Sequence, residues 1–199
     1  MRHLQSLVLL GLLFSCSRAP TSGSSARHEP PPHAVPAQPD PQRYDEIVVV
    51  GTNDFHGYLR PVETDLSGAK VIQGGAEWFA GYVTALQAKF GERLVLLDGG
   101  DMYQGTIDSN MYLGKSVEDY YNLLPYRALA LGNHEFDYGP EKKNGKDKRG
   151  AIKQRMLESK HPFVQANIFV RATGQLWREK HLFPSVLVDA GGYKVGIIG

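Results

Sequence analysis

The sequence predicts an α/β protein, and two apolar runs separated by one helical segment are the clearest indication. Residues 47–50 and 94–97 are short runs of branched apolar residues, which are typical of strands buried on both faces. Between them, apolar residues recur at helical spacing over 79–90, and Gly91 follows as the expected helix end. Strands that alternate with helices in this way favour a parallel sheet covered by helices.

The alternation continues along the chain. Residues 128–131 predict a third, weaker strand, and a helix over 151–160 and a strand over 163–169 are expected after it. Ser116 to Asp119 resembles a capping box that would open a short helix, which Pro125 would end.

A hairpin is expected near the end of the sequence. Residues 185–189 and 193–198 have strand-like patterns, and they are separated by the turn-forming segment Ala190-Gly191-Gly192.

Residues 1–16 resemble a secretory signal. A basic start at Arg2 precedes a short apolar stretch, which is well below the roughly 20 residues that a membrane span needs. Leu13-Phe14-Ser15-Cys16 resembles the bacterial lipobox, in which the cysteine is lipidated and becomes the mature N-terminus. Cys16 is therefore the expected lipid anchor in the cell envelope. Phe14 departs from the small residue that this pattern prefers, so plain signal cleavage nearby is the alternative.

Residues 17–43 are expected to form a disordered Pro/Ser-rich tether. They hold seven of the twelve prolines and almost no large apolar residue, so little burial would offset the entropy of ordering them. The globular part is then 44–199.

Composition excludes several classes of protein. The 199 residues are 42% hydrophobic with a formal net charge of +1, and residues 44–199 carry 18 basic and 19 acidic residues. This balance argues against a partner that is a nucleic-acid polymer. A single cysteine excludes a disulfide framework and a multi-cysteine zinc site.

Each of the first three predicted strands is followed by a polar cluster. The clusters read GTNDFHG at 51–57, DGGD at 98–101 and GNHEFD at 132–137. The carboxyl ends of neighbouring parallel strands share one crevice, so these clusters are expected to converge. Oxygen and nitrogen donors without thiolate suit manganese, zinc, magnesium or iron.

Spacing suggests how the clusters hold a metal ion. Asp54 and His56 are two residues apart, and in an extended segment their side chains point to the same side and can bind one ion. Asn133 and His134 are more specific, because neither residue suits the body of a buried strand.

The combination D-x-H, then G-G-D, then G-N-H-E resembles the calcineurin-like metallophosphoesterases. The strings TNDFHG, LLDGGDMYQGT and LGNHEFDYG are similar to the secreted 5′-nucleotidase and 2′,3′-cyclic phosphodiesterase branch of that superfamily, over residues 46–199. The resemblance implies a four-layer α/β/β/α sandwich with two divalent metal ions, of manganese, zinc, magnesium, iron or calcium. It also implies a small phosphate ester, and in particular a nucleotide, as the substrate.

The resemblance assigns roles to individual residues. Asp54 and His56 would hold the first metal, Asp101 would bridge both, and Asn133 would bind the second metal and contact the substrate. Asp98 matches no ligand position and is expected to be structural.

Hydrolysis of a phosphate ester needs charge neutralisation and a proton for the leaving alkoxide. Two metal ions would neutralise phosphoryl oxygens and acidify the attacking water for in-line attack. His134 is placed to act as general acid or electrostatic stabiliser, and Asp137, three residues later, to orient its ring. The family assigns this pair the same work. Glu135 is the alternative base, less favoured because the family makes it neither ligand nor catalyst.

The sequence departs from the family at its end. The resemblance implies further histidines, one alone and then G-H-x-H, and a C-terminal nucleotide-binding domain, none of which precedes Gly199. The sandwich is therefore expected to be incomplete at the C-terminus, and the 199-residue form alone to have little hydrolase activity.

Two functions stay open. The first is a lipid-anchored two-metal hydrolase of nucleotides, exported to the bacterial cell envelope. The second is a non-catalytic lipoprotein, either a binding module or a truncated inactive remnant.

Overall fold

The computed structural model describes residues 46–199. The expected signal, the tether and Cys16 lie outside the described residues. Within the described range, no helix is both long and apolar enough to cross a membrane.

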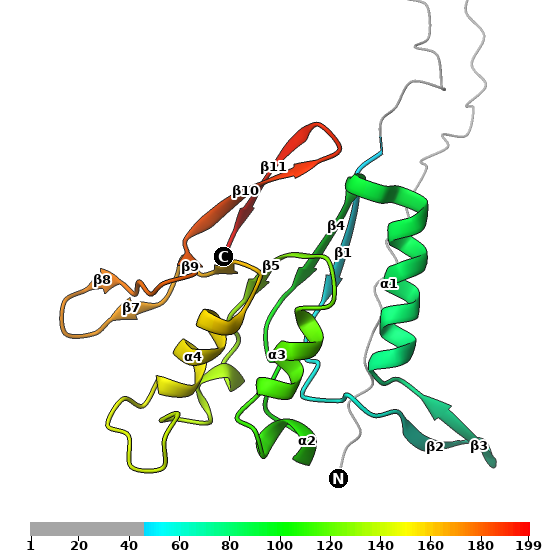
Figure 1. Cartoon of the computed structure of the whole chain (residues 1–199), viewed down its shortest axis with the longest axis horizontal. Helices are drawn as coiled ribbons and strands as arrows, with labels where there is room; N and C mark the ends of the chain where they lie inside the picture. Colours follow the sequence, from blue (N-terminus) through cyan, green and yellow to red (C-terminus); the bar gives the residue numbers. More distant parts are fainter. Residues whose placement is uncertain (1–45) are drawn as a thin grey trace, which may run out of the picture. The chain divides into compact units, whose positions relative to one another are not determined.

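A five-stranded parallel sheet forms the centre of the described part of the chain (Figure 1). Its strands lie in the order β1-β4-β5-β6-β9, and each neighbouring pair is parallel. The bounds are β1 Val48–Thr52, β4 Leu94–Asp98, β5 Tyr126–Ala130, β6 Phe163–Val164 and β9 Leu182–Phe183. β4 is an inner strand of this sheet and its apolar residues are buried on both faces, as its sequence predicts. β1, at the edge of the sheet, leaves Val49 58% exposed, so the expectation that 47–50 is buried on both faces is wrong.

Helices connect these strands. They are α1 Ala76–Phe90, α2 Ile107–Asn110, α3 Lys115–Tyr121 and α4 Gly150–Glu158, with 3₁₀ turns η1 Gly91–Arg93 and η2 His134–Phe136. Three antiparallel hairpins complete the described fold: β2 Val62–Leu66 with β3 Ala69–Gln73, β7 Phe169–Val170 with β8 Gln175–Leu176, and β10 Ser185–Ala190 with β11 Tyr193–Ile198.

The α/β class is confirmed, as are the first three strands, the helix before Gly91 and the last hairpin, with bounds shifted by a few residues. The expected strand over 163–169 is wrong. Only Phe163–Val164 joins the parallel sheet, and Phe169–Val170 pairs with a separate short strand.

The capping-box interpretation is also wrong. Lys115 is the first residue of the helix and Gly114, in a left-handed conformation (φ 82°), is its N-cap, so Ser116 lies inside the helix. The Ser116 hydroxyl donates to the Asp108 carbonyl, and Asp119, which would complete the box, accepts from the Lys115 ammonium at 2.7 Å. Neither side chain therefore caps the helix.

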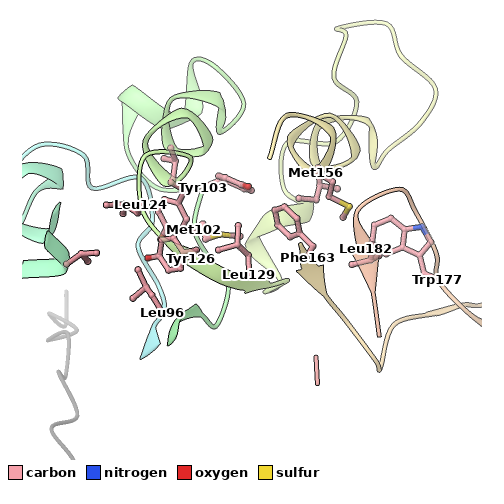
Figure 2. Packing of buried hydrophobic residues seen from close by; sticks show 14 residues of the cluster. Leu96, Met102, Tyr103, Leu124, Tyr126, Leu129, Met156, Phe163, Trp177 and Leu182 are labelled. Atoms are coloured by element: carbon pink, nitrogen blue, oxygen red, sulfur yellow. The ribbon is translucent and has the colours of Figure 1, made fainter. Parts of the chain in front are cut away.

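The core lies between the parallel strands and the helices. In Figure 2 the labelled side chains fill this layer, with Leu96 and Leu129 from the central strands below and Met156 from α4 above. All three are fully buried. Burial of large apolar side chains here stabilises the sheet edge at which the polar clusters emerge.

Asp98, the last residue of β4, is a buried carboxylate in a network of hydroxyl groups. It is 4% exposed and accepts hydrogen bonds from the Thr52 hydroxyl (2.6 Å), the Tyr121 hydroxyl (3.0 Å) and the Gly100 backbone N–H (2.8 Å). The structure therefore places Asp98 inside the fold, in agreement with a structural role. Burial raises the pKa of this carboxyl to about 6, although its three donors act in the opposite direction.

This pKa gives a testable stability prediction. Because the folded protein binds the Asp98 proton more tightly than the unfolded chain, this stabilising contribution is present at low pH and is lost as the pH rises through about 6. The free energy of unfolding of the wild type, minus that of Asp98→Asn, should fall by about 1.4 kcal/mol between pH 5 and pH 8. Urea unfolding at several pH values measures it.

Asp119→Asn, which removes a carboxylate from the exposed surface of α3, is the matched control. A difference between wild type and Asp98→Asn that stays constant over this pH range would contradict the prediction.

Candidate metal centre and acid–base pair

The three polar clusters converge, as the sequence predicts. The loop after β1 runs beside the loop after β4 through backbone hydrogen bonds. The N–H groups of Asp54, His56 and Gly57 donate to the carbonyls of Gly100, Asp101 and Met102, at 2.9, 3.0 and 3.0 Å. The loop after β5 joins them through the His134 backbone N–H, which donates to the Asp101 carboxylate at 2.9 Å.

Three of the predicted metal ligands have left-handed backbone conformations. The φ angles are 55° for Asp54, 50° for His56 and 59° for Asp101. Such angles are uncommon for residues other than glycine, cost about 1–3 kcal/mol each, and cluster at functional sites. The expectation of an extended Asp54–His56 segment is therefore wrong, but the two side chains still meet, with 3.5 Å between Asp54 Oδ1 and His56 Nε2.

His56, Asp101 and His134 form a group that could hold a metal ion. One donor atom of each lies within 4.8 Å of the others, and all three residues are half-buried. Two imidazoles and a carboxylate are a donor set that suits zinc, manganese or iron. The residues present thus fit a divalent cation, and His134, expected from sequence to be an acid, stands within the same group.

His56 is oriented by a backbone carbonyl. Its Nδ1 lies 2.6 Å from the Gln104 carbonyl oxygen, which can only accept a hydrogen bond. In the neutral ring the proton must therefore sit on Nδ1, and Nε2 is left with its lone pair toward Asp54 and the site. Nothing in the sequence around Gln104 signals this role, because the contact uses the main chain.

Asp54 and Asn133 lie at the rim of the group. Asp54 is 51% exposed at its side chain and accepts a hydrogen bond from the Asn53 side-chain amide. Asn133 is the residue that precedes η2, and it is exposed next to His134. Both remain available to a ligand that approaches from solvent.

His134 and Asp137 form a close pair across the turn η2. His134 Nδ1 lies 2.6 Å from Asp137 Oδ2, and this hydrogen bond is the main cause that raises the pKa of the imidazole above its ordinary value. The carboxylate fixes the proton on Nδ1, so the Nε2 side of the ring is the one left for chemistry.

Glu135, between these two residues, is 1% exposed. Its carboxylate accepts backbone N–H groups from Asp101 (2.8 Å), Met102 (2.7 Å) and Gly132 (2.6 Å). Both oxygens are therefore committed to the main chain, and a role as general base does not fit this position. Sequence reasoning missed this contact, since a glutamate in a polar loop gives no signal that it is buried.

The loops after β4 and β5 approach so closely that glycine is required. A Cβ on Gly132 would lie 2.1 Å from the Asp101 carboxylate oxygen Oδ1, and one on Gly100 would lie 2.3 Å from the Gly132 nitrogen. Gly100 also has a φ of 101°. These two glycines allow the contact that brings Asp101 under His134.

Comparisons with known proteins identify relatives of the described part. No family model matches the chain. The 5′-nucleotidase of Mus musculus is 36% identical over 159 residues, which are 77% of this chain and 26% of that protein. The chain thus spans about a quarter of the length of the curated relatives it matches.

Comparison with solved structures also finds 5′-nucleotidases. The 5′-nucleotidase precursor from Thermus thermophilus matches with a TM-score of 0.64 and 36% identity, over 76% of this chain and 27% of that one. A calcineurin-like phosphoesterase from Bacillus subtilis shares the fold at a TM-score of 0.50 and 22% identity, over 74% of this chain and 45% of that one. The described part of the chain therefore belongs with the 5′-nucleotidases, and it has the fold of the calcineurin-like phosphoesterases.

Proposed function

We propose that the chain carries the metal-binding and acid–base part of a site that hydrolyses phosphate esters. The observation that carries this proposal is the grouping of His56 and Asp101, which would hold a metal, with His134, whose ring is hydrogen-bonded to Asp137 and would carry the proton. The relatives are 5′-nucleotidases and a phosphoesterase, which supports the same class of reaction.

Two divalent ions are the proposed cofactors. Asp54 and His56 would hold the first, Asp101 would be shared, and Asn133 would contribute to the second. When bound, such ions neutralise phosphoryl oxygens and acidify a water for in-line attack. Manganese, zinc, magnesium, iron and calcium all remain candidates for an oxygen and nitrogen donor set.

His134 is the proposed general acid. As the attacking oxygen bonds to phosphorus and the bond to the leaving oxygen breaks, a proton on His134 Nε2 would pass to that leaving oxygen. Asp137 would hold the Nδ1 proton and stabilise the charged ring before the transfer. The exposed amide of Asn133 would donate to a phosphoryl oxygen of the substrate.

The proposed substrate is a small phosphate ester, and a nucleotide is the favoured class because the relatives are named as nucleotidases. A nucleic-acid polymer is not proposed, since the near-neutral charge of residues 44–199 gives little attraction to one.

One prediction concerns metal binding. His56→Ala removes the imidazole proposed to hold the first ion, so the affinity for Mn²⁺ should fall at least about tenfold. Electron paramagnetic resonance of free Mn²⁺ during titration measures it. His181→Asn is the matched control, because His181 is outside the group and asparagine tolerates its φ of 66°. A wild type that binds no Mn²⁺ would contradict the proposed function.

A second prediction concerns turnover. Among residues 46–199 only the group described above offers three clustered donors, which is sparse for two ions. The 199-residue polypeptide with Mn²⁺ should therefore hydrolyse p-nitrophenyl phosphate slowly, at less than about 1 s⁻¹. Robust turnover that His134→Ala abolishes would overturn this expectation and would support His134 as the catalytic acid.

We also propose export to the bacterial cell envelope with a lipid on Cys16, on the strength of the lipobox-like sequence. Expression in a bacterial host with an alkyne-labelled fatty acid should label the wild type and not Cys16→Ser. Equal labelling of both, or none in the wild type, would exclude the anchor.

A further inference from the structure

The carboxylate of Glu135 lies beneath the candidate metal centre and joins two loops. Oε2 accepts from the N–H groups of Asp101 and Gly132, and Oε1 accepts from that of Met102. Asp101 and Met102 follow β4, whereas Gly132 follows β5. One side chain therefore satisfies three backbone donors from two adjacent strand ends, in a place that is closed to water.

Asp101 is held in place by three hydrogen bonds in this arrangement. Its N–H is held by Glu135, its carbonyl accepts the His56 N–H at 3.0 Å, and its carboxylate accepts the His134 N–H at 2.9 Å. Since its φ of 59° is unfavourable, these bonds are needed to keep the residue in this conformation. Glu135 is the only one of the three partners whose side chain supplies the bond.

We propose that Glu135 is a positioning residue for metal binding, which sets the Asp101 carboxylate relative to His56 and His134 without contacting metal or substrate. This inference rests on the proposed function, because it concerns the ligands of the same site. The burial of Glu135 argues against contact with a substrate, and the donor group that could hold a metal does not include it.

A second buried glutamate offers a matched control. Glu118 on α3 is fully buried, and its carboxylate accepts the Tyr103 hydroxyl instead of backbone N–H groups of the site. Replacing either glutamate with glutamine removes one buried charge from a similar depth. A general loss of stability would therefore affect both variants, whereas a loss of Asp101 positioning would affect only Glu135→Gln.

The experiment compares wild type, Glu135→Gln and Glu118→Gln in two measurements. In the metal-free proteins, amide hydrogen exchange of Asp101, Met102 and Gly132 should accelerate at least about tenfold in Glu135→Gln, because the glutamine amide has one acceptor oxygen where the carboxylate has two. The Mn²⁺ dissociation constant should rise about 10- to 100-fold in the same variant. Glu118→Gln should leave both quantities within about twofold of wild type.

Unchanged exchange, or an unchanged Mn²⁺ affinity, in folded Glu135→Gln would overturn the inference, and so would an equal loss of affinity in Glu118→Gln. If Glu135→Gln does not fold, Glu135→Asp keeps the charge and moves it by one methylene, and the same criteria apply to it. A wild type that binds no Mn²⁺ contradicts the proposed function instead. The exchange measurement then still decides whether Glu135 holds the two loops together.

Discussion

Backbone N–H groups at the ends of parallel strands lose their partners in the sheet, and in this protein buried carboxylates accept them. Asp98 accepts one such group from Gly100, and Glu135 accepts three from the loops that follow β4 and β5. Without these acceptors the loops would leave buried donors unsatisfied, at a cost of about 1–3 kcal/mol each. These acceptors therefore hold the conformation of the loops that carry Asp101 and His134.

The arrangement separates two kinds of carboxylate by burial. Asp98 and Glu135 are closed to solvent and bond to the main chain or to hydroxyl groups, whereas Asp54 and Asp137 are open to solvent and face imidazoles. The buried carboxylates hold the loops in their conformation, whereas the exposed carboxylates can bind a cation or a proton. Residues of one chemical type thus have different roles in this site, and burial decides which role each has.

Much of this could be predicted from the sequence, for identifiable reasons. The apolar runs at β1 and β4 indicate strands, and the polar clusters after them lead directly to the site. Burial on both faces holds for β4 but not for β1, because the sequence does not reveal that β1 lies at the edge of the sheet and leaves Val49 exposed. Two-residue strands such as β6 and β9 have no periodicity of their own, and only their neighbours make them strands. Left-handed conformations at Asp54, His56 and Asp101 are likewise imposed by tertiary bonds. The role of Glu135 depends on three main-chain groups, two of them more than 30 positions away, which no local pattern reveals.

The contact between Gly132 and Asp101 has a consequence for how this site tolerates change. A methyl group at position 132 would fall on the Asp101 carboxylate and lie 2.6 Å from the Asp101 backbone nitrogen, so the loop after β4 would have to move. The carboxylate displaced by such a movement is the one that accepts the His134 N–H. A substitution at this small, uncharged position would therefore alter the donor group without replacing any of its members.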